Sequence, residues 1–127
     1  HVGDSRTYRL KNSTLKQLTK DHSLVQEQLD QGIISPDEAR RHAMRNVILR
    51  AVGVNDTVAL DILKGKKNPG DLFLLCSDGL TDMVSESAVF SALRADGALS
   101  EKSATLIQLA KQAGGKDNVT VVLSAVV

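Results

Sequence analysis

Leu72-Phe73-Leu74-Leu75-Cys76-Ser77-Asp78-Gly79 is the stretch that decides the fold. Its five consecutive apolar residues form a run short enough for a strand that is buried on both faces. The run stops abruptly at Asp78-Gly79, a pair that is typical of a turn. A carboxylate at the end of a buried strand is costly unless it is paired or binds a cation. The stretch therefore predicts a central strand and, directly after it, a candidate cation ligand.

Further strands are predicted on both sides of this run. Residues 6–10 and 14–19 fit a hairpin, and a turn at 68–71 leads into the central strand. Val58, Leu60 and Ile62 alternate with other residues, as in a half-buried strand. The β-branched, apolar residues 119–127 predict a buried closing strand.

Helices are predicted where the apolar period changes from two to about 3.6. The segment that begins at Ser35-Pro36 has a serine N-cap, a proline at the first helical position and a glutamate at the third. Strands are grouped early and two helices come late, before one final strand, so the pattern predicts an α+β domain and not a βαβ repeat. The four expected helices are capped by Ser23, Ser35, Ser85 and Ser100 and the last of them ends at Gly114-Gly115.

Composition excludes several classes of protein. The 127 residues fit one domain, and the net charge of +1 together with 2% aromatic residues disfavours a nucleic-acid binder. The single cysteine, Cys76, rules out an internal disulfide and a cysteine-rich zinc site, and its apolar strand predicts a buried hydrophobe. No export or membrane segment is visible, which favours a cytoplasmic protein.

Eleven of the fifteen acidic residues are aspartates, and four of these lie beside expected strands. Carboxylates without nearby histidine or cysteine ligands suit hard ions such as Mg²⁺ or Mn²⁺. A turn or capping role stays open for each aspartate taken alone. Asp82 comes four residues after Asp78, so a short turn could place both carboxylates on one side. The candidate ligands are Asp4, Asp78, Asp82 and Asp117.

Several short motifs occur in an order that resembles one family. They are Gly3-Asp4-Ser5-Arg6, Leu18-Thr19-Lys20-Asp21-His22-Ser23, Cys76-Ser77-Asp78-Gly79-Leu80-Thr81-Asp82 and Gly114-Gly115-Lys116-Asp117-Asn118-Val119-Thr120-Val121. The ordered set resembles the metal-dependent protein serine/threonine phosphatases, the protein phosphatase 2C family, and most closely its bacterial single-domain members. His42-Ala43-Met44-Arg45-Asn46 is similar to a further family segment, with Ala43 where proline is usual.

This resemblance implies a fold, a cofactor and a reaction. The expected fold is part of an α-β-β-α sandwich, two antiparallel sheets flanked by helices, with two core Mn²⁺ or Mg²⁺ ions and a third, weaker ion. Asp78 and Asp117 match core ligands, and Asp4 and Asp82 match acids associated with the third ion. Residues from about 22 to 52 match a flap beside the active site. The expected reaction is hydrolysis of phosphoserine and phosphothreonine in proteins by water that the metals activate.

The resemblance also indicates what this chain does not supply. The chain begins with His1 inside an apparent strand, so residues 1–127 are expected to be the C-terminal portion of one catalytic domain. The general acid, a phosphate-binding arginine and a metal-bridging aspartate belong to the preceding part. The chain alone is therefore expected to be inactive or very weak and to self-associate through uncovered strands. The kinase that opposes it is expected to be a bacterial serine/threonine kinase.

Two alternatives stay open. The first is a non-catalytic regulatory or interaction module of the same fold, which the preceding sequence would distinguish. The second is an unrelated magnesium phosphohydrolase with an aspartyl nucleophile, which the late strand–helix–helix–strand order fits poorly. His22 and His42 are interpreted as flap or capping residues, with a proton-donating role as the alternative, and His1 as a strand residue.

Overall fold

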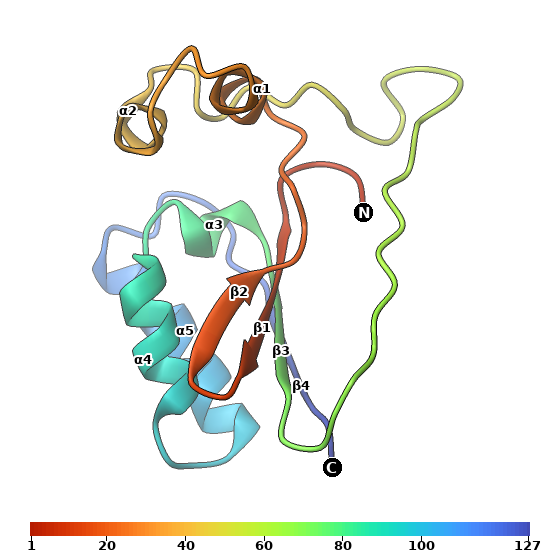
Figure 1. Cartoon of the computed structure of the whole chain (residues 1–127). Coiled ribbons are helices and arrows are strands. Elements are labelled where there is room, and N and C mark those ends of the chain that lie inside the picture. Colours follow the sequence, from red (N-terminus) through yellow and green to blue (C-terminus); the bar gives the residue numbers. More distant parts are fainter. The chain divides into compact units, whose positions relative to one another are not determined.

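The computed structural model describes all residues, 1–127, and has four strands and five helices in two compact units (Figure 1). The small unit comprises His1–Asp4 and Lys20–Leu63, and the sheet unit comprises Ser5–Thr19 and Lys64–Val127. The mixture of helices and an antiparallel sheet confirms the predicted α+β class. None of the five helices has the length and apolar composition that a membrane crossing requires.

The sheet unit is built on one antiparallel sheet with the strand order β2-β1-β3-β4. The first two strands form the predicted hairpin, whose turn residues Asn12 and Ser13 have φ of 47° and 61°. A tight two-residue hairpin turn of the favoured type I′ needs positive φ at both positions. The strands are β1 (Arg6–Lys11), β2 (Thr14–Gln17), β3 (Leu72–Cys76) and β4 (Val121–Ala125).

The hydrophobic core lies on one face of this sheet. Leu72, Leu74 and Cys76 are buried there among side chains of the helices α4 (Glu86–Arg94) and α5 (Leu99–Gln112), which cover that face (Figure 1). Leu75, whose side chain is on the other face, is 44% exposed. The prediction of a strand buried on both faces is therefore wrong, because helices cover one face only. The closing strand is likewise an edge strand, and its Val122 is 52% exposed.

Three helices follow β3 in the sheet unit: α3 (Asp78–Thr81), α4 (Glu86–Arg94) and α5 (Leu99–Gln112). Ser85 caps α4 as predicted, its Oγ accepting a hydrogen bond from the Ala88 N–H at 3.3 Å. The predicted cap at Ser100 is wrong, because α5 begins at Leu99. The Glu101 carboxylate accepts the N–H of the capping residue, Ala98, at 2.8 Å, so the helix start is satisfied without a serine.

The small unit contains α1 (Leu24–Asp30) and α2 (Pro36–Arg41). Ser23 and Ser35 cap them as predicted, and the second has a complete capping box. The strand predicted at Val58–Ile62 is absent: these residues pair with no strand, and Leu60 and Ile62 are 62% and 76% exposed. Alternation of apolar residues makes a strand only where a neighbouring strand offers hydrogen bonds.

A buried carboxylate fixes the turn that leads into β3. Asp71 is 2% exposed, and its Oδ2 accepts hydrogen bonds from the Asn68 N–H at 2.7 Å and from the Arg9 guanidinium on β1. Burial by itself raises the pKa of Asp71, but the N–H of Asn68 and the guanidinium of Arg9 outweigh it and hold that pKa below its ordinary value. Ionised Asp71 therefore ties β1 to the turn.

We expect Asp71→Asn to lower the urea midpoint of unfolding at pH 7, because the amide leaves Arg9 without its anionic partner. A carboxylate whose pKa is lower in the folded protein than in the unfolded chain stabilises the folded state at pH values above the unfolded-state pKa. This stabilisation is lost as the pH falls through the folded-state pKa. The difference between the two proteins should therefore shrink below pH ~4. Asp37→Asn is the matched control, since its carboxylate is 84% exposed. Equal midpoints at pH 7 would contradict the assignment.

Candidate metal centre

The chain changes from strand to helix at the first candidate ligand. β3 ends at Cys76, Ser77 is the N-cap of α3, and Asp78 is the first residue of that helix. Asp78 is partly buried, in keeping with its place at the end of a core strand. Its backbone is thus held on one side by the sheet and on the other by the first turn of α3.

Ser77 connects this strand end to the segment that carries Asp117. Its N–H donates to the Thr120 O at 3.1 Å, and its Oγ accepts from the Thr120 N–H at 3.0 Å and donates to the Asn118 O at 3.3 Å. These bonds continue the β3–β4 pairing, in which Cys76 faces Val121. The backbones of 77–79 and 117–120 therefore lie together at one end of the sheet.

Gly79 allows the closest part of this approach. A Cβ built on it would lie 2.1 Å from the Asn118 O and 2.9 Å from the Asn118 carbonyl carbon. No side chain fits in that space, so the residue after Asp78 must be a glycine if Asn118 is to remain where it is. The Asp-Gly pair is explained by close packing of two backbones as well as by a turn.

Asp82 and Asp117 lie at the same end of the sheet unit. The Asp82 N–H donates to the Asp78 O at 2.8 Å, which places these two aspartates one helical turn apart, on the same face of the helix as predicted. Asp117 is exposed, and its Oδ1 accepts from the next backbone N–H, that of Asn118, at 2.6 Å. The structure thus places the backbones of three of the four predicted ligands at one end of the sheet unit, and their role as ligands of one centre stays a prediction.

Asp4 belongs to the small unit, where it follows Gly3 and is partly buried. Its assignment to the same centre stays a prediction. Carboxylate oxygens are the ligands that hard divalent cations prefer, so the donor chemistry fits Mn²⁺ or Mg²⁺. No group of three or more His, Cys, Asp or Glu side chains in this chain is arranged to hold a metal ion. That the chain carries only part of a ligand set stays a prediction.

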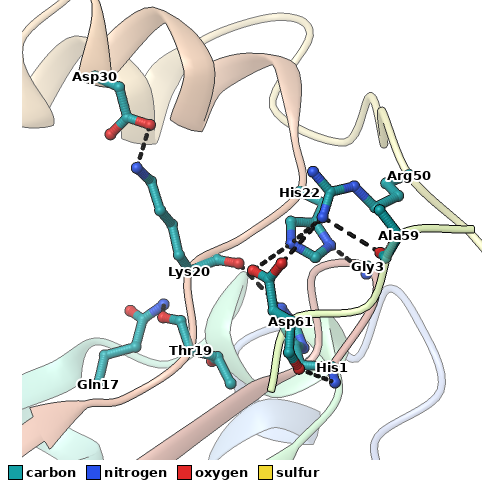
Figure 2. Close-up of polar contacts among 10 residues, drawn as sticks. All are labelled: His1, Gly3, Gln17, Thr19, Lys20, His22, Asp30, Arg50, Ala59 and Asp61. Carbon is teal, nitrogen blue, oxygen red and sulfur yellow. Dashed lines mark hydrogen bonds and ion pairs between the residues drawn. The ribbon is translucent and has the colours of Figure 1, made fainter. Parts of the chain in front are cut away.

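The three histidines lie in the small unit. His42 is the C-cap residue of α2, and its Nδ1 accepts from the Met44 N–H at 3.1 Å, in agreement with a capping role. His1 is in no strand, which corrects that expectation. His22 is not a helix cap, since Ser23 caps α1; its ring instead contacts Asp61 (Figure 2).

Sequence reasoning missed the roles of three residues. Ser77 and Gly79 stand inside the quoted motif, but their contacts with the 117–120 segment depend on the β3–β4 register. Asp61 is 39 residues from His22 along the chain, and no local pattern links the two. Only the Asp-Gly pair carried a signal, and that signal also fits an ordinary turn.

A scan of protein-family profiles finds none that matches this chain. The serine/threonine phosphatase stp of Listeria welshimeri is 48% identical over 123 residues, which are 97% of this chain and 49% of that protein. The crystal structure of the Mycobacterium tuberculosis serine/threonine phosphatase PstP/Ppp has a TM-score of 0.92 and 43% identity, covering 97% of this chain and 52% of that one.

A structure of the PstP catalytic domain in complex with two manganese ions has a TM-score of 0.80 and 42% identity, covering 97% of this chain and 50% of that one. The chain thus spans about half the length of the relatives that it matches. The TM-scores confirm the predicted fold, part of an α-β-β-α sandwich.

We expect Gly79→Ala to destabilise the sheet unit by about 1–3 kcal/mol, the usual range for overpacking. The added methyl group would displace the Asn118 carbonyl and with it the hydrogen bonds of Ser77. Urea unfolding followed by circular dichroism measures the effect. Gly65→Ala is the matched control, because nothing lies within 4 Å of a Cβ at that position. Two equally stable variants would refute the close approach.

Proposed function

The chain is homologous over nearly its whole length to part of the bacterial serine/threonine phosphatases of the PPM type, and from this premise we propose that it is the C-terminal portion of a protein phosphatase catalytic domain. The proposed reaction of the intact protein is hydrolysis of phosphoserine and phosphothreonine in proteins, dependent on Mn²⁺ or Mg²⁺. The relatives that support this proposal carry serine/threonine phosphatase names.

One observation of the chain itself carries the proposal. Asp78 and Asp117 are 39 residues apart in the sequence, yet Ser77 and Gly79 hold their two backbone segments together at one end of the sheet. Carboxylates that the backbone brings to one end of a sheet can bind a divalent cation together, and the cation offsets their negative charge. The approach of these two segments supports a cation-binding role for Asp78 and Asp117.

In the proposed centre, Asp78 and Asp117 would hold the core ions, and Asp82 and Asp4 would be ligands of a third. Bound divalent ions supply a water nucleophile at neutral pH and offset the charge of the phosphoryl group. The chain positions the ligands: the N-terminal turn of α3 fixes Asp78, and the 117–120 backbone fixes Asp117. The remaining ligand, the general acid and the phosphate-binding arginine are assigned to the preceding part of the domain.

Substrates and partners follow from the same proposal. The substrates are phosphorylated proteins, and a bacterial serine/threonine kinase is the class of enzyme that supplies them. Residues 22–52, which include α1 and α2, are proposed as the flap that controls access to the site. A cytoplasmic location, and a partner list without nucleic acid or membrane, stay predictions.

The activity is tested on the full-length protein with a phosphothreonine peptide. We expect hydrolysis to depend on added Mn²⁺ and to fall by more than ~100-fold in Asp78→Asn and Asp117→Asn, since even partners outside the ligand shell change affinity or activity by 10–100-fold. Asp56→Asn, an exposed aspartate in the small unit, is the control. A folded, Mn²⁺-binding protein without turnover would favour the non-catalytic module, and metal-independent turnover would refute the proposed mechanism.

The isolated chain is expected to be inactive, because the remaining site residues are assigned to the preceding part of the domain. It is also expected to self-associate, because the face of the sheet opposite the helices is uncovered. Leu75 and Val122 are paired neighbours on β3 and β4, and they are 44% and 52% exposed. Replacing both with threonine keeps strand propensity and reduces apolar surface. Light scattering should then show a smaller mean mass than for the unaltered chain at equal concentration. A monomeric unaltered chain would refute the expectation.

A further inference from the structure

A second polar cluster lies in the small unit, outside the candidate metal centre (Figure 2). The Nε2 of His22 is 2.8 Å from Asp61 Oδ2, and Arg50 Nη1 donates to Asp61 Oδ1 at 3.1 Å and to the Ala59 O at 3.3 Å. The His22 side chain is 8% exposed, so its ring is enclosed, while the carboxylate and the guanidinium reach solvent. The metal centre described above uses none of these three side chains.

The hydrogen bonds define the tautomer of His22. The Gly3 N–H donates to His22 Nδ1 at 3.1 Å, and a backbone N–H can only donate. Nδ1 is therefore the acceptor, and Nε2 carries the proton that points to Asp61. Arg50 Nη1 also lies 3.2 Å from Nε2, but a protonated Nε2 cannot accept from it, so the Asp61 carboxylate is what holds this guanidinium beside the ring. The hydrogen bond from His22 and the charge of Arg50 hold the pKa of Asp61 below its ordinary value, which keeps this partner ionised.

His22 forms hydrogen bonds with both the backbone N–H and the backbone O of Gly3. The Gly3 N–H is bonded to the imidazole ring, and the Gly3 O accepts from the His22 N–H at 2.9 Å. Gly3 has φ of +102°, a conformation that L side chains rarely adopt. Two bonds on a residue with such free rotation fix the direction of the chain directly before Asp4.

We propose that His22 is a positioning residue for Asp4, and that the Asp61–Arg50 pair sets the ring of His22 so that Gly3 presents Asp4 to the weakly held cation. This inference rests on the proposed function, because the role of Asp4 as a ligand is part of it. The bound metal needs no contact with His22. A group that orients a ligand through one intervening residue changes affinity in the way that outer-shell partners do.

Two conservative variants distinguish the role of His22 Nδ1, which contacts Gly3, from that of Nε2, which contacts Asp61. In His22→Asn the side-chain oxygen takes the place of Nδ1 and can still accept from Gly3, while the contact with Asp61 is lost. In His22→Gln the amide nitrogen takes the place of Nε2 and can still reach Asp61, while the acceptor for Gly3 is lost. The proposal predicts that the glutamine variant is the more damaging of the two for the binding of the weak cation.

The experiment measures Mn²⁺ binding to the full-length protein by electron paramagnetic resonance of the free ion, together with the Mn²⁺ dependence of phosphopeptide hydrolysis. We expect His22→Gln to weaken the weakest Mn²⁺ site by about tenfold, as Asp4→Asn does. His22→Asn should restore most of the affinity. The double variant Asp4→Asn/His22→Gln should bind no more weakly than Asp4→Asn alone, because both changes remove one interaction.

Unchanged Mn²⁺ affinity in a folded His22→Gln protein, or effects of the two single changes that add in the double variant, would overturn the proposal. Asp56→Asn, which changes an exposed aspartate of the same unit outside the flap, is the matched control and should leave binding and turnover unchanged. An unaltered protein that neither binds Mn²⁺ nor hydrolyses the peptide would instead overturn the proposed function itself.

Discussion

The contact between Gly79 and the Asn118 carbonyl is the constraint on which the site depends. It requires a glycine directly after the first aspartate, a bend of the 117–120 segment and the hydrogen bonds of Ser77. All three features are compatible with the β3–β4 register, in which Cys76 lies opposite Val121. The hydrophobic core between the sheet and the helices stabilises that register. The placement of the backbone at Asp78 and Asp117 is therefore a consequence of sheet packing.

Much of this arrangement could be predicted from the sequence, because local signals agreed with the tertiary fold. The hairpin, the caps at Ser23, Ser35 and Ser85, and the position of β3 all follow from patterns within a few residues. The candidate ligands were found from their places at strand ends and from ordered motifs. The approach of the Asp78 and Asp117 segments to one end of the sheet then follows from the antiparallel pairing of β3 and β4.

The errors have a common physical cause, which is that burial depends on partners distant in the sequence. Leu75 was expected to be buried, yet one face of the sheet has no covering layer. Leu60 and Ile62 have the alternation of a strand, but no strand pairs with them. The ring of His22 and the carboxylate of Asp61 meet only through the fold of the small unit. The periodicity of a sequence indicates which residues are apolar, but the elements that cover them are determined by the tertiary fold.

The single departure of the chain from the sheet unit, between Thr19 and Lys64, has a consequence for evolution. β1 and β3 pair directly, Arg6 opposite Cys76, so every folding event must close a long loop that contains this excursion. The entropy of loop closure grows only with the logarithm of length, and each doubling costs about 0.6 kcal/mol. Insertions and deletions in the excursion are therefore cheap for the sheet. This segment can diversify in length and sequence while the strands and the carboxylates at their ends stay constant.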